Sequence, residues 1–259
     1  MLDENRLKQE CENAIEWIRE YVNKSKAKGV IIGLSGGKDS AVVLAMLVKA
    51  VGKENVLAVS MPCNSISEDY DDAKLVADVF NVRFSTVDLT ETYNIFENTL
   101  NNEISKFGEN ELTKESKVNI KPRLRMTTLY GIAQTFGYLV AGTGNLSEKM
   151  VGYTTKWGDS ASDFNPIANF TVSEVLAIGK MLGVPEKILQ KAPSDGLGGQ
   201  TDEEKMGIKY SQIEEMIETG NTDENAKQII LRKFEASKHK RKSVPTYEFN
   251  RKNYLLDNE

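Results

Sequence analysis

The feature that most constrains the fold is a glycine-rich loop between an apolar segment and an apolar helix. Residues 30–34 (VIIGL) are apolar, and residues 40–51 (SAVVLAMLVKAV) form a longer apolar run after the loop. A short apolar run of this kind is typical of a strand buried on both faces of a parallel sheet. A glycine turn that leads into a helix presents backbone amides, which bind phosphate groups. The loop therefore predicts an α/β sheet with a phosphate site beside its first strand.

The rest of the chain repeats the alternation of strand and helix. We expect strands at residues 30–34, 56–61, 82–87, 138–142 and near 164–167, and helices at 7–22, 40–51, 67–80, 93–107, 123–136, 172–182, 210–218 and 223–237. Residues 108–122 are polar and aperiodic, which favours a loop. This alternation predicts a doubly wound parallel sheet of about five strands with helices on both faces. Because no repeat or low-complexity linker interrupts residues 1–259, we expect a single domain.

Composition excludes several classes of site. Cys11 and Cys63 have no metal-binding spacing and His239 is the only histidine, which argues against a zinc centre and excludes a histidine-rich metal site. The net charge of −5 predicts no nucleic-acid partner. No apolar run approaches the roughly 20 residues that span a bilayer, and the charged N-terminus is unlike a secretory signal. The expected protein is a cytoplasmic enzyme with no membrane partner.

The loop carries groups that suit nucleotide phosphates. Its residues are Gly33, Leu34, Ser35, Gly36, Gly37, Lys38, Asp39 and Ser40. Lys38 supplies a cation, and Asp39 supplies a ligand for the Mg²⁺ that accompanies nucleotide phosphates. The Walker pattern fails because Asp39 follows the lysine, and the dinucleotide fingerprint fails because the glycines are wrongly spaced. The remaining alternative is a tight strand-to-helix turn whose glycines serve geometry alone.

The string SGGKDS at 35–40 resembles the signature of the ATP pyrophosphatase superfamily, whose members cleave ATP between the α and β phosphates. Later segments resemble NAD synthetases: KPRLRM at 121–126, AGTGNLSE at 141–148, GYTTKWGDSASD at 152–163, KAPSDGL at 191–197, GQTDEE at 199–204 and HKRK at 239–242. The resemblance covers most of the chain and implies a Rossmann-like fold of the adenine nucleotide alpha hydrolase type. It also implies ATP-dependent amidation of deamido-NAD (nicotinic acid adenine dinucleotide) with ammonia. The products would be NAD, AMP and pyrophosphate, formed through an adenylated carboxylate.

The resemblance implies roles for individual residues. Thr143 and Ser194 would bind ATP together with the loop, and Asp39 and Glu148 would hold Mg²⁺. The residues that match the deamido-NAD site are Arg123, Lys156, Asp163, His239 and Lys240. Asp39, Lys38 and Asp159 would take part in catalysis, with Asp159 as the general base toward ammonium. The resemblance further implies a homodimer. Because the first strand begins near residue 30, we expect no glutaminase domain and hence ammonia as the nitrogen donor.

One position departs from the family pattern. A lysine that binds ATP commonly follows the threonine matching Thr171, but this chain has Val172 there. We expect nucleotide binding to persist through another cation, with Lys180 as one candidate. Trp157 is expected either to stack on a ligand ring or to pack in the core. The glycine-rich segment 195–206 is expected to act as a lid.

Two other functions remain as alternatives. A different ATP pyrophosphatase, such as a tRNA-modifying or GMP-forming enzyme, would share the loop, although a tRNA enzyme would need a basic surface. A nucleotide-binding module without catalysis would share the fold, but it would have no need of two metal-binding acids. AMP formation that requires deamido-NAD separates these possibilities.

Overall fold

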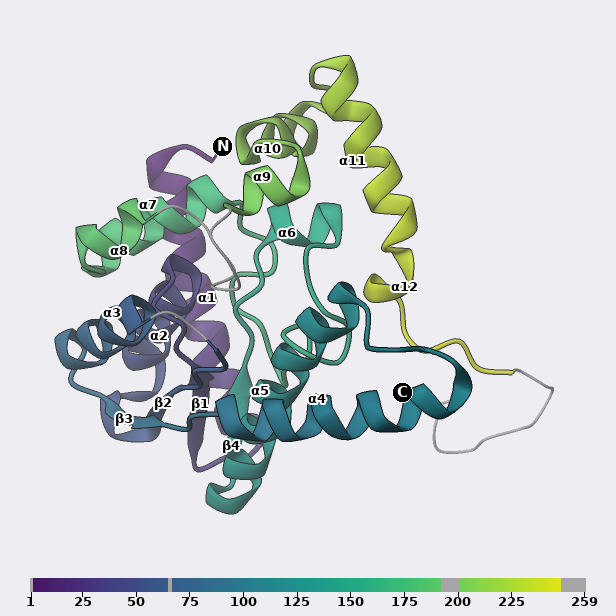
Figure 1. The fold of residues 1–259 in the computed structure, drawn as a ribbon. Coiled ribbons are helices and arrows are strands. Elements are labelled where there is room, and N and C mark those ends of the chain that lie inside the picture. Colours follow the sequence, from purple (N-terminus) through teal and green to yellow (C-terminus); the bar gives the residue numbers. More distant parts are fainter. Residues whose placement is uncertain (1, 65–66, 192–200, 248–259) are drawn as a thin grey trace.

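The computed structural model describes residues 2–64, 67–191 and 201–247. Its centre is a parallel sheet in the order β3-β2-β1-β4 (Figure 1). The strands are β1 (Gly29–Gly33), β2 (Val56–Ser60), β3 (Arg83–Thr86) and β4 (Tyr138–Ala141). The predicted α/β fold is confirmed, with four strands in the described sheet in place of about five.

The strand expected near 164–167 is wrong. Phe164 makes only an isolated parallel bridge with Ala141, in which Gly142 N–H donates to the Phe164 carbonyl at 2.8 Å. The chain cannot continue this pairing regularly, because Pro166 follows two residues later and has no N–H to donate. The apolar residues of this segment instead pack into the core, where Phe164 and Ile167 are buried.

Helices cover both faces of the sheet, as the alternation predicted. In β1, Val30 and Ile32 belong to one apolar cluster and Ile31 belongs to another, because successive side chains point to opposite faces. The first cluster includes residues of α1 (Glu4–Lys24), α2 (Lys38–Val51), α3 (Ser67–Val79), α7 (Val172–Leu182) and α8 (Glu186–Gln190). The second includes residues of α4 (Thr90–Ile104) and α5 (Lys114–Phe136).

The loop expected at 108–122 is wrong beyond residue 113, where α5 begins. Thr113 caps the helix by accepting a hydrogen bond from Ser116 N–H at 3.2 Å. Pro122 lies inside the helix and removes one backbone donor, whose partner would be the Val118 carbonyl. Val118 and Pro122 both line the cleft described below, so solvent in the cleft can satisfy that carbonyl. A proline at this position therefore does not end the helix.

The C-terminal helices form a third apolar cluster beside the sheet. It includes residues of α6 (Leu146–Val151), α9 (Asp202–Met206), α10 (Tyr210–Thr219) and α11 (Glu224–Ala236), and α12 (Lys238–Arg241) follows. The helices α6, α8, α9 and α12 were not expected, because each is too short to show a helical period. Two short 3₁₀ helices, η1 (Lys53–Asn55) and η2 (Ser105–Phe107), complete the described elements. Nowhere in the described ranges is a helix both long and apolar enough to cross a membrane.

Candidate active site

A cleft of about 660 Å³ opens at the carboxyl ends of β1, β2 and β4. The strand order changes direction here, since β2 and β4 lie on opposite sides of β1, and such crevices are where open α/β sheets bind ligands. Every residue of the phosphate loop except Gly36 lines the cleft. Other predicted site residues also line it, namely Thr143, Glu148, Asp159 and Lys240. The fold thus brings together residues far apart in the sequence.

Hydrogen bonds made by two serine hydroxyls hold the phosphate loop in a tight turn. The hydroxyl of Ser40 donates to the Gly37 carbonyl at 3.0 Å and lies 3.1 Å from the Ser35 hydroxyl. Gly36 has a φ of +79°, a conformation that favours glycine. A Cβ atom at Gly36 would lie 2.4 Å from the Asp69 carbonyl oxygen, so the loop packs directly on α3. Gly37 then precedes α2, whose N-terminus faces the cleft.

Charged groups gather where the loop meets α6. The Lys38 ammonium is buried and lies 3.0 Å from Asp39 Oδ2. Burial lowers the pKa of Lys38, but the charges of Asp39 and Glu148 outweigh it, so the pKa lies above its usual value. Asp39 Oδ1 accepts a hydrogen bond of 3.1 Å from Asn145 Nδ2, which joins the loop to the start of α6. Lys38 therefore remains charged at neutral pH.

Asp39 and Glu148 form a pair of like charges that suits a divalent cation. Burial and the charge of Asp39 raise the pKa of Glu148 well above its usual value. Glu148 Oε2 accepts from Asn145 N–H at 3.0 Å, which fixes the carboxylate beside the loop. Carboxylate oxygens are preferred Mg²⁺ ligands, and a bound cation would remove the repulsion between the two acids. The described residues offer no cluster of three or more ligands, so phosphate oxygens and water would complete the shell.

Asp159 and Lys240 also line the cleft. Asp159 accepts hydrogen bonds from the Thr154 hydroxyl and from Thr155 N–H, the latter at 2.8 Å. Lys240 Nζ donates to the carbonyls of Gly152 and Thr154 at 2.8 and 2.6 Å. Burial lowers the pKa of Lys240, and the charge of Asp159 acts in the opposite direction. Lys240, on α12, thus contacts the loop that carries Asp159.

Four of the residues assigned to deamido-NAD lie outside the described lining of the cleft, namely Arg123, Lys156, Asp163 and His239. Arg123 is exposed and donates to the Lys156 carbonyl. Asp163 accepts from Val140 N–H at 2.7 Å and from the Tyr130 hydroxyl at 3.1 Å, so both of its oxygens already have partners. His239 is exposed on α12. Their roles stay predictions, as does that of Ser194, which lies outside the described residues.

Lys180 does not take the place of the ATP-binding lysine that is absent at position 172. Val172 is buried in the third apolar cluster, whereas Lys180 is exposed and lies outside the described lining. Trp157 is 55% exposed and is therefore not a core residue, and Lys156 Nζ lies 5.2 Å from the centroid of its ring. The first part of the expected lid, 195–200, lies outside the described residues, and its last part forms helix α9.

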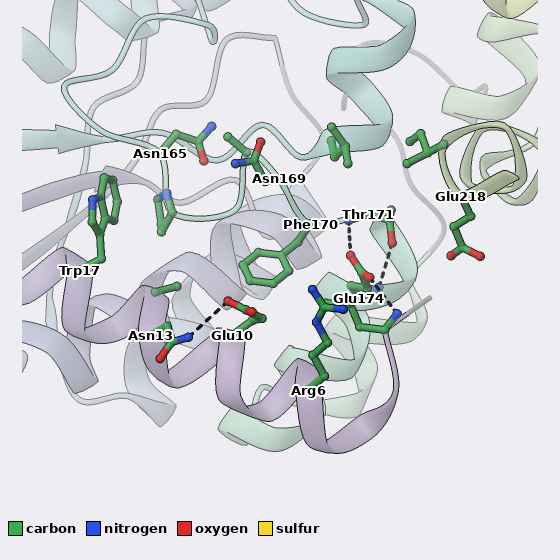
Figure 2. Close-up of a pocket in the computed structure, with 16 residues that line it drawn as sticks. Arg6, Glu10, Asn13, Trp17, Asn165, Asn169, Phe170, Thr171, Glu174 and Glu218 are labelled. Carbon is green, nitrogen blue, oxygen red and sulfur yellow. Dashed lines mark hydrogen bonds between the residues drawn. The ribbon is translucent and has the colours of Figure 1, made fainter. Parts of the chain in front are cut away.

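A second hollow of about 710 Å³ lies between α1 and the segment 165–171. Figure 2 shows Glu10 and Asn13 hydrogen-bonded to each other on α1, with Thr171 and Glu174 paired near the start of α7. No residue of the phosphate loop lies in its described lining. Among the described residues, the predicted phosphate loop thus lines the first cleft and not this hollow.

Sequence reasoning missed several polar residues in the cleft and beside it. Asn145, which follows the lining residue Gly144, is buried and forms a capping box with Glu148, and the spacing of these two residues was a readable signal for a helix start. Asp202 and Tyr153 line the cleft itself, but they come from separate segments that the third apolar cluster brings together. Lys191 lines the cleft as well, where it pairs with two aspartates of α3.

Comparison with known proteins identifies the family. The family model described as NAD synthase matches residues 10–252. An NH(3)-dependent NAD(+) synthetase from Finegoldia magna is 41% identical, over 94% of this chain and 98% of that protein. The structure of NMN synthetase from Francisella tularensis superimposes with a TM-score of 0.86 at 35% identity, covering 94% of this chain and 99% of that one. That of an NH3-dependent NAD synthetase from Campylobacter jejuni gives 0.75 at 28% identity, covering 96% and 100%. The chain therefore belongs to the NAD synthase family.

Proposed function

We propose that this chain amidates the carboxylate of deamido-NAD with ammonia, at the cost of one ATP cleaved to AMP and pyrophosphate. The observation that carries the proposal is the placement of Lys38, Asp39 and Glu148 around a phosphate loop, with Asp159 in the same cleft. The relatives named NH(3)-dependent NAD(+) synthetase support ammonia as the donor. The two buried free cysteines and the use of ATP support a reducing, cytoplasmic setting.

The first step joins the substrate carboxylate to AMP. A carboxylate oxygen attacks the α-phosphorus of ATP, and the bond to the bridging oxygen breaks to release pyrophosphate. Both reactants are anions, so Lys38 and the amides at the start of α2 lower the repulsion and orient the β and γ phosphates. Asp39 and Glu148 would hold Mg²⁺, which neutralises charge on the phosphate oxygens when bound.

The second step forms the amide. Ammonia attacks the acyl carbon, the bond between that carbon and the AMP oxygen breaks, and AMP leaves. The attacking nitrogen must lose a proton, and we assign Asp159, a carboxylate in the lining of the cleft, as its acceptor. The hydrogen bonds that Asp159 accepts from Thr154 and Thr155 fix the orientation of its carboxylate.

The direct test mixes the protein with ATP, Mg²⁺, ammonium and deamido-NAD, and measures AMP and NAD. We expect both products in equal amounts, with no AMP unless an acceptor is present. The likeness to the NMN synthetase makes a mononucleotide with the same carboxylate the second acceptor to test. A higher kcat/KM for that mononucleotide would reassign the acceptor. AMP formation that requires RNA would overturn the proposal for both acceptors.

Lys156→Ala is expected to raise the KM for deamido-NAD by about tenfold and to leave the KM for ATP within about twofold, because one cation facing an anionic ligand contributes on the order of 1.4 kcal/mol. Steady-state kinetics with each substrate varied in turn measures the two values. Lys149→Ala is the matched control, since Lys149 is exposed on the neighbouring helix α6 and lies outside the described lining of the cleft. An equal rise in both KM values would remove Lys156 from the acceptor site.

The cation that stands in for a lysine at position 172 is proposed to be Lys191. Among the described residues, the cations that line the cleft are Lys38, Arg125, Lys191 and Lys240. Lys191 Nζ lies 2.8 Å from Asp69 Oδ1 and 2.7 Å from Asp72 Oδ2, on the helix that supports Gly36. Arg125 instead donates to the Met61 carbonyl at 3.0 Å, at the end of β2. Apart from Lys38, Lys191 is therefore the lining cation that pairs with Asp69, the residue on which Gly36 packs.

We also propose a homodimer. Arg123 and Trp157 are exposed on the surface beside the cleft, so the proposed acceptor site is open on the side where these residues lie. A second subunit would cover that side and complete the site. Sedimentation equilibrium measures the assembly directly, and a monomer at assay concentration would contradict the proposal.

A further inference from the structure

Asp202 is a buried carboxylate in the cleft that neither step of the proposed reaction uses. It is the first residue of α9 and is 6% exposed, yet it lines the same cleft as the phosphate loop. Its Oδ1 accepts a hydrogen bond from the Tyr153 hydroxyl at 3.0 Å, and its Oδ2 faces the Tyr210 hydroxyl at 3.4 Å. The two tyrosines approach from different segments, one after α6 and one at the start of α10.

The same side chains surround the buried lysine of the phosphate loop. Lys38 Nζ lies 5.7 Å from the centroid of the Tyr210 ring, a distance at which an ammonium is attracted to the ring face. The charge of Asp202 also acts on Lys38, in addition to those of Asp39 and Glu148. Lys38 therefore interacts with the loop through Asp39 and with the C-terminal helices through the Tyr210 ring and the charge of Asp202.

The interaction of Lys38 with Asp202 and Tyr210 matters because Asp39 is also expected to bind the metal ion. When Asp39 binds a cation, its oxygens have less negative charge available for the neighbouring ammonium. A buried ammonium that loses its counter-charge would turn toward solvent or toward the metal-binding acids. Asp202 supplies a carboxylate near Lys38 that is not assigned to the metal, and the tyrosine hydroxyls stabilise its charge.

We propose that Asp202 is a positioning residue for ATP: held by Tyr153 and Tyr210, it keeps the Lys38 ammonium directed at the nucleotide phosphates. Asp202 thus couples the third apolar cluster, which includes Tyr210 and Met206, to the phosphate loop. The proposal rests on the proposed function for its ligand, ATP, but not on the identity of the acceptor.

The test measures ATP affinity by calorimetry in the absence of acceptor, and then the kinetics of the full reaction. Asp202→Asn keeps the size of the side chain and removes its charge. We expect a rise of roughly tenfold in both the Kd and the KM for ATP, the loss typical of one charge-assisted contact. The KM for deamido-NAD and the Mg²⁺ concentration for half-maximal rate should stay within about twofold, since Asp202 is assigned to neither ligand.

Glu203→Gln is the matched control. Glu203 lies in the same turn of α9 and accepts a hydrogen bond of 2.8 Å from Tyr210 N–H, which glutamine can also accept. This variant should bind ATP like the wild type. Tyr153→Phe keeps the ring and removes one donor to Asp202, so it should weaken ATP binding by about threefold, as expected for one hydrogen bond. The Tyr153→Phe variant therefore still tests the role of Asp202 if Asp202→Asn does not fold.

Three outcomes would overturn the proposal. Unchanged ATP affinity in a folded Asp202→Asn variant would reduce Asp202 to a structural residue. A raised Mg²⁺ requirement would make it a metal ligand instead. Equal loss in the Glu203→Gln control would show a general effect on α9. If the wild type binds ATP but forms no NAD, the proposed function fails while the affinity measurements still decide the role of Asp202.

Discussion

Asp39→Asn is expected to lower kcat by about 10²- to 10³-fold, the range seen when one essential group that stabilises transition-state charge is removed. Asparagine keeps an oxygen that can accept from Asn145 Nδ2, so the contact between the loop and α6 survives. The variant loses the charge that Glu148 needs as a partner in binding Mg²⁺, and it also loses the ion pair to Lys38. Both losses act on the step that cleaves ATP.

The measurements are the rate of AMP release as a function of Mg²⁺ concentration and the midpoint of thermal unfolding. We expect the Mg²⁺ requirement to rise and the unfolding midpoint to change little, since the lost like-charge repulsion offsets the lost ion pair. Asp78→Asn is the control, because Asp78 is an exposed aspartate paired with Lys74 on α3. An unchanged Mg²⁺ requirement in Asp39→Asn would remove Asp39 from the metal site.

The sequence was informative wherever a local pattern determines a local structure. The apolar segment 30–34, the glycines after it and the apolar run 40–51 predicted β1, the turn and α2, because burial on both faces leaves an uninterrupted apolar pattern. The resemblance, rather than the strand alternation, implied Thr143 and Glu148 as site residues. Both line the same cleft as the loop, because β4 pairs with β1 and parallel strands end at one edge of the sheet.

The sequence was less informative where tertiary contacts override a local signal. Residues 108–122 were polar and aperiodic, which favoured a loop, but Lys114 to Pro122 lie within α5, where Ile120 is buried in the second apolar cluster. Asp163 was assigned to the substrate by resemblance, and the sequence did not show that its two oxygens also accept hydrogen bonds from Val140 N–H and the Tyr130 hydroxyl. Asp202 belongs to the string GQTDEE but was given no role of its own, because its place in the cleft depends on how α9 and α10 pack.

The stability of the protein also depends on the backbone conformation of the phosphate loop. Of the substitutions considered, Gly36→Ala is expected to lower the free energy of unfolding the most. Two costs add at this position. The φ of +79° costs an alanine about 1 kcal/mol. The new Cβ would also lie 2.4 Å from the Asp69 carbonyl oxygen, which belongs to the backbone of α3 and cannot swing away. Forcing the two segments apart costs about 1–3 kcal/mol more. The expected loss in the free energy of unfolding is therefore about 3 kcal/mol.

Gly183→Ala separates the two costs. Gly183 ends α7 with the same φ of +79°, but a Cβ there would meet no atom within 4 Å among the described residues. Its substitution should cost only about 1 kcal/mol, the conformational share, and should leave ATP affinity unchanged. Urea denaturation of both variants measures the difference, and calorimetry with ATP measures the function. Because relief of the clash must move the loop away from α3, Gly36→Ala should also weaken ATP binding by at least tenfold, about 1.4 kcal/mol. Equal stability losses in the two variants would mean that the loop does not pack on Asp69, and that its glycines serve backbone conformation alone.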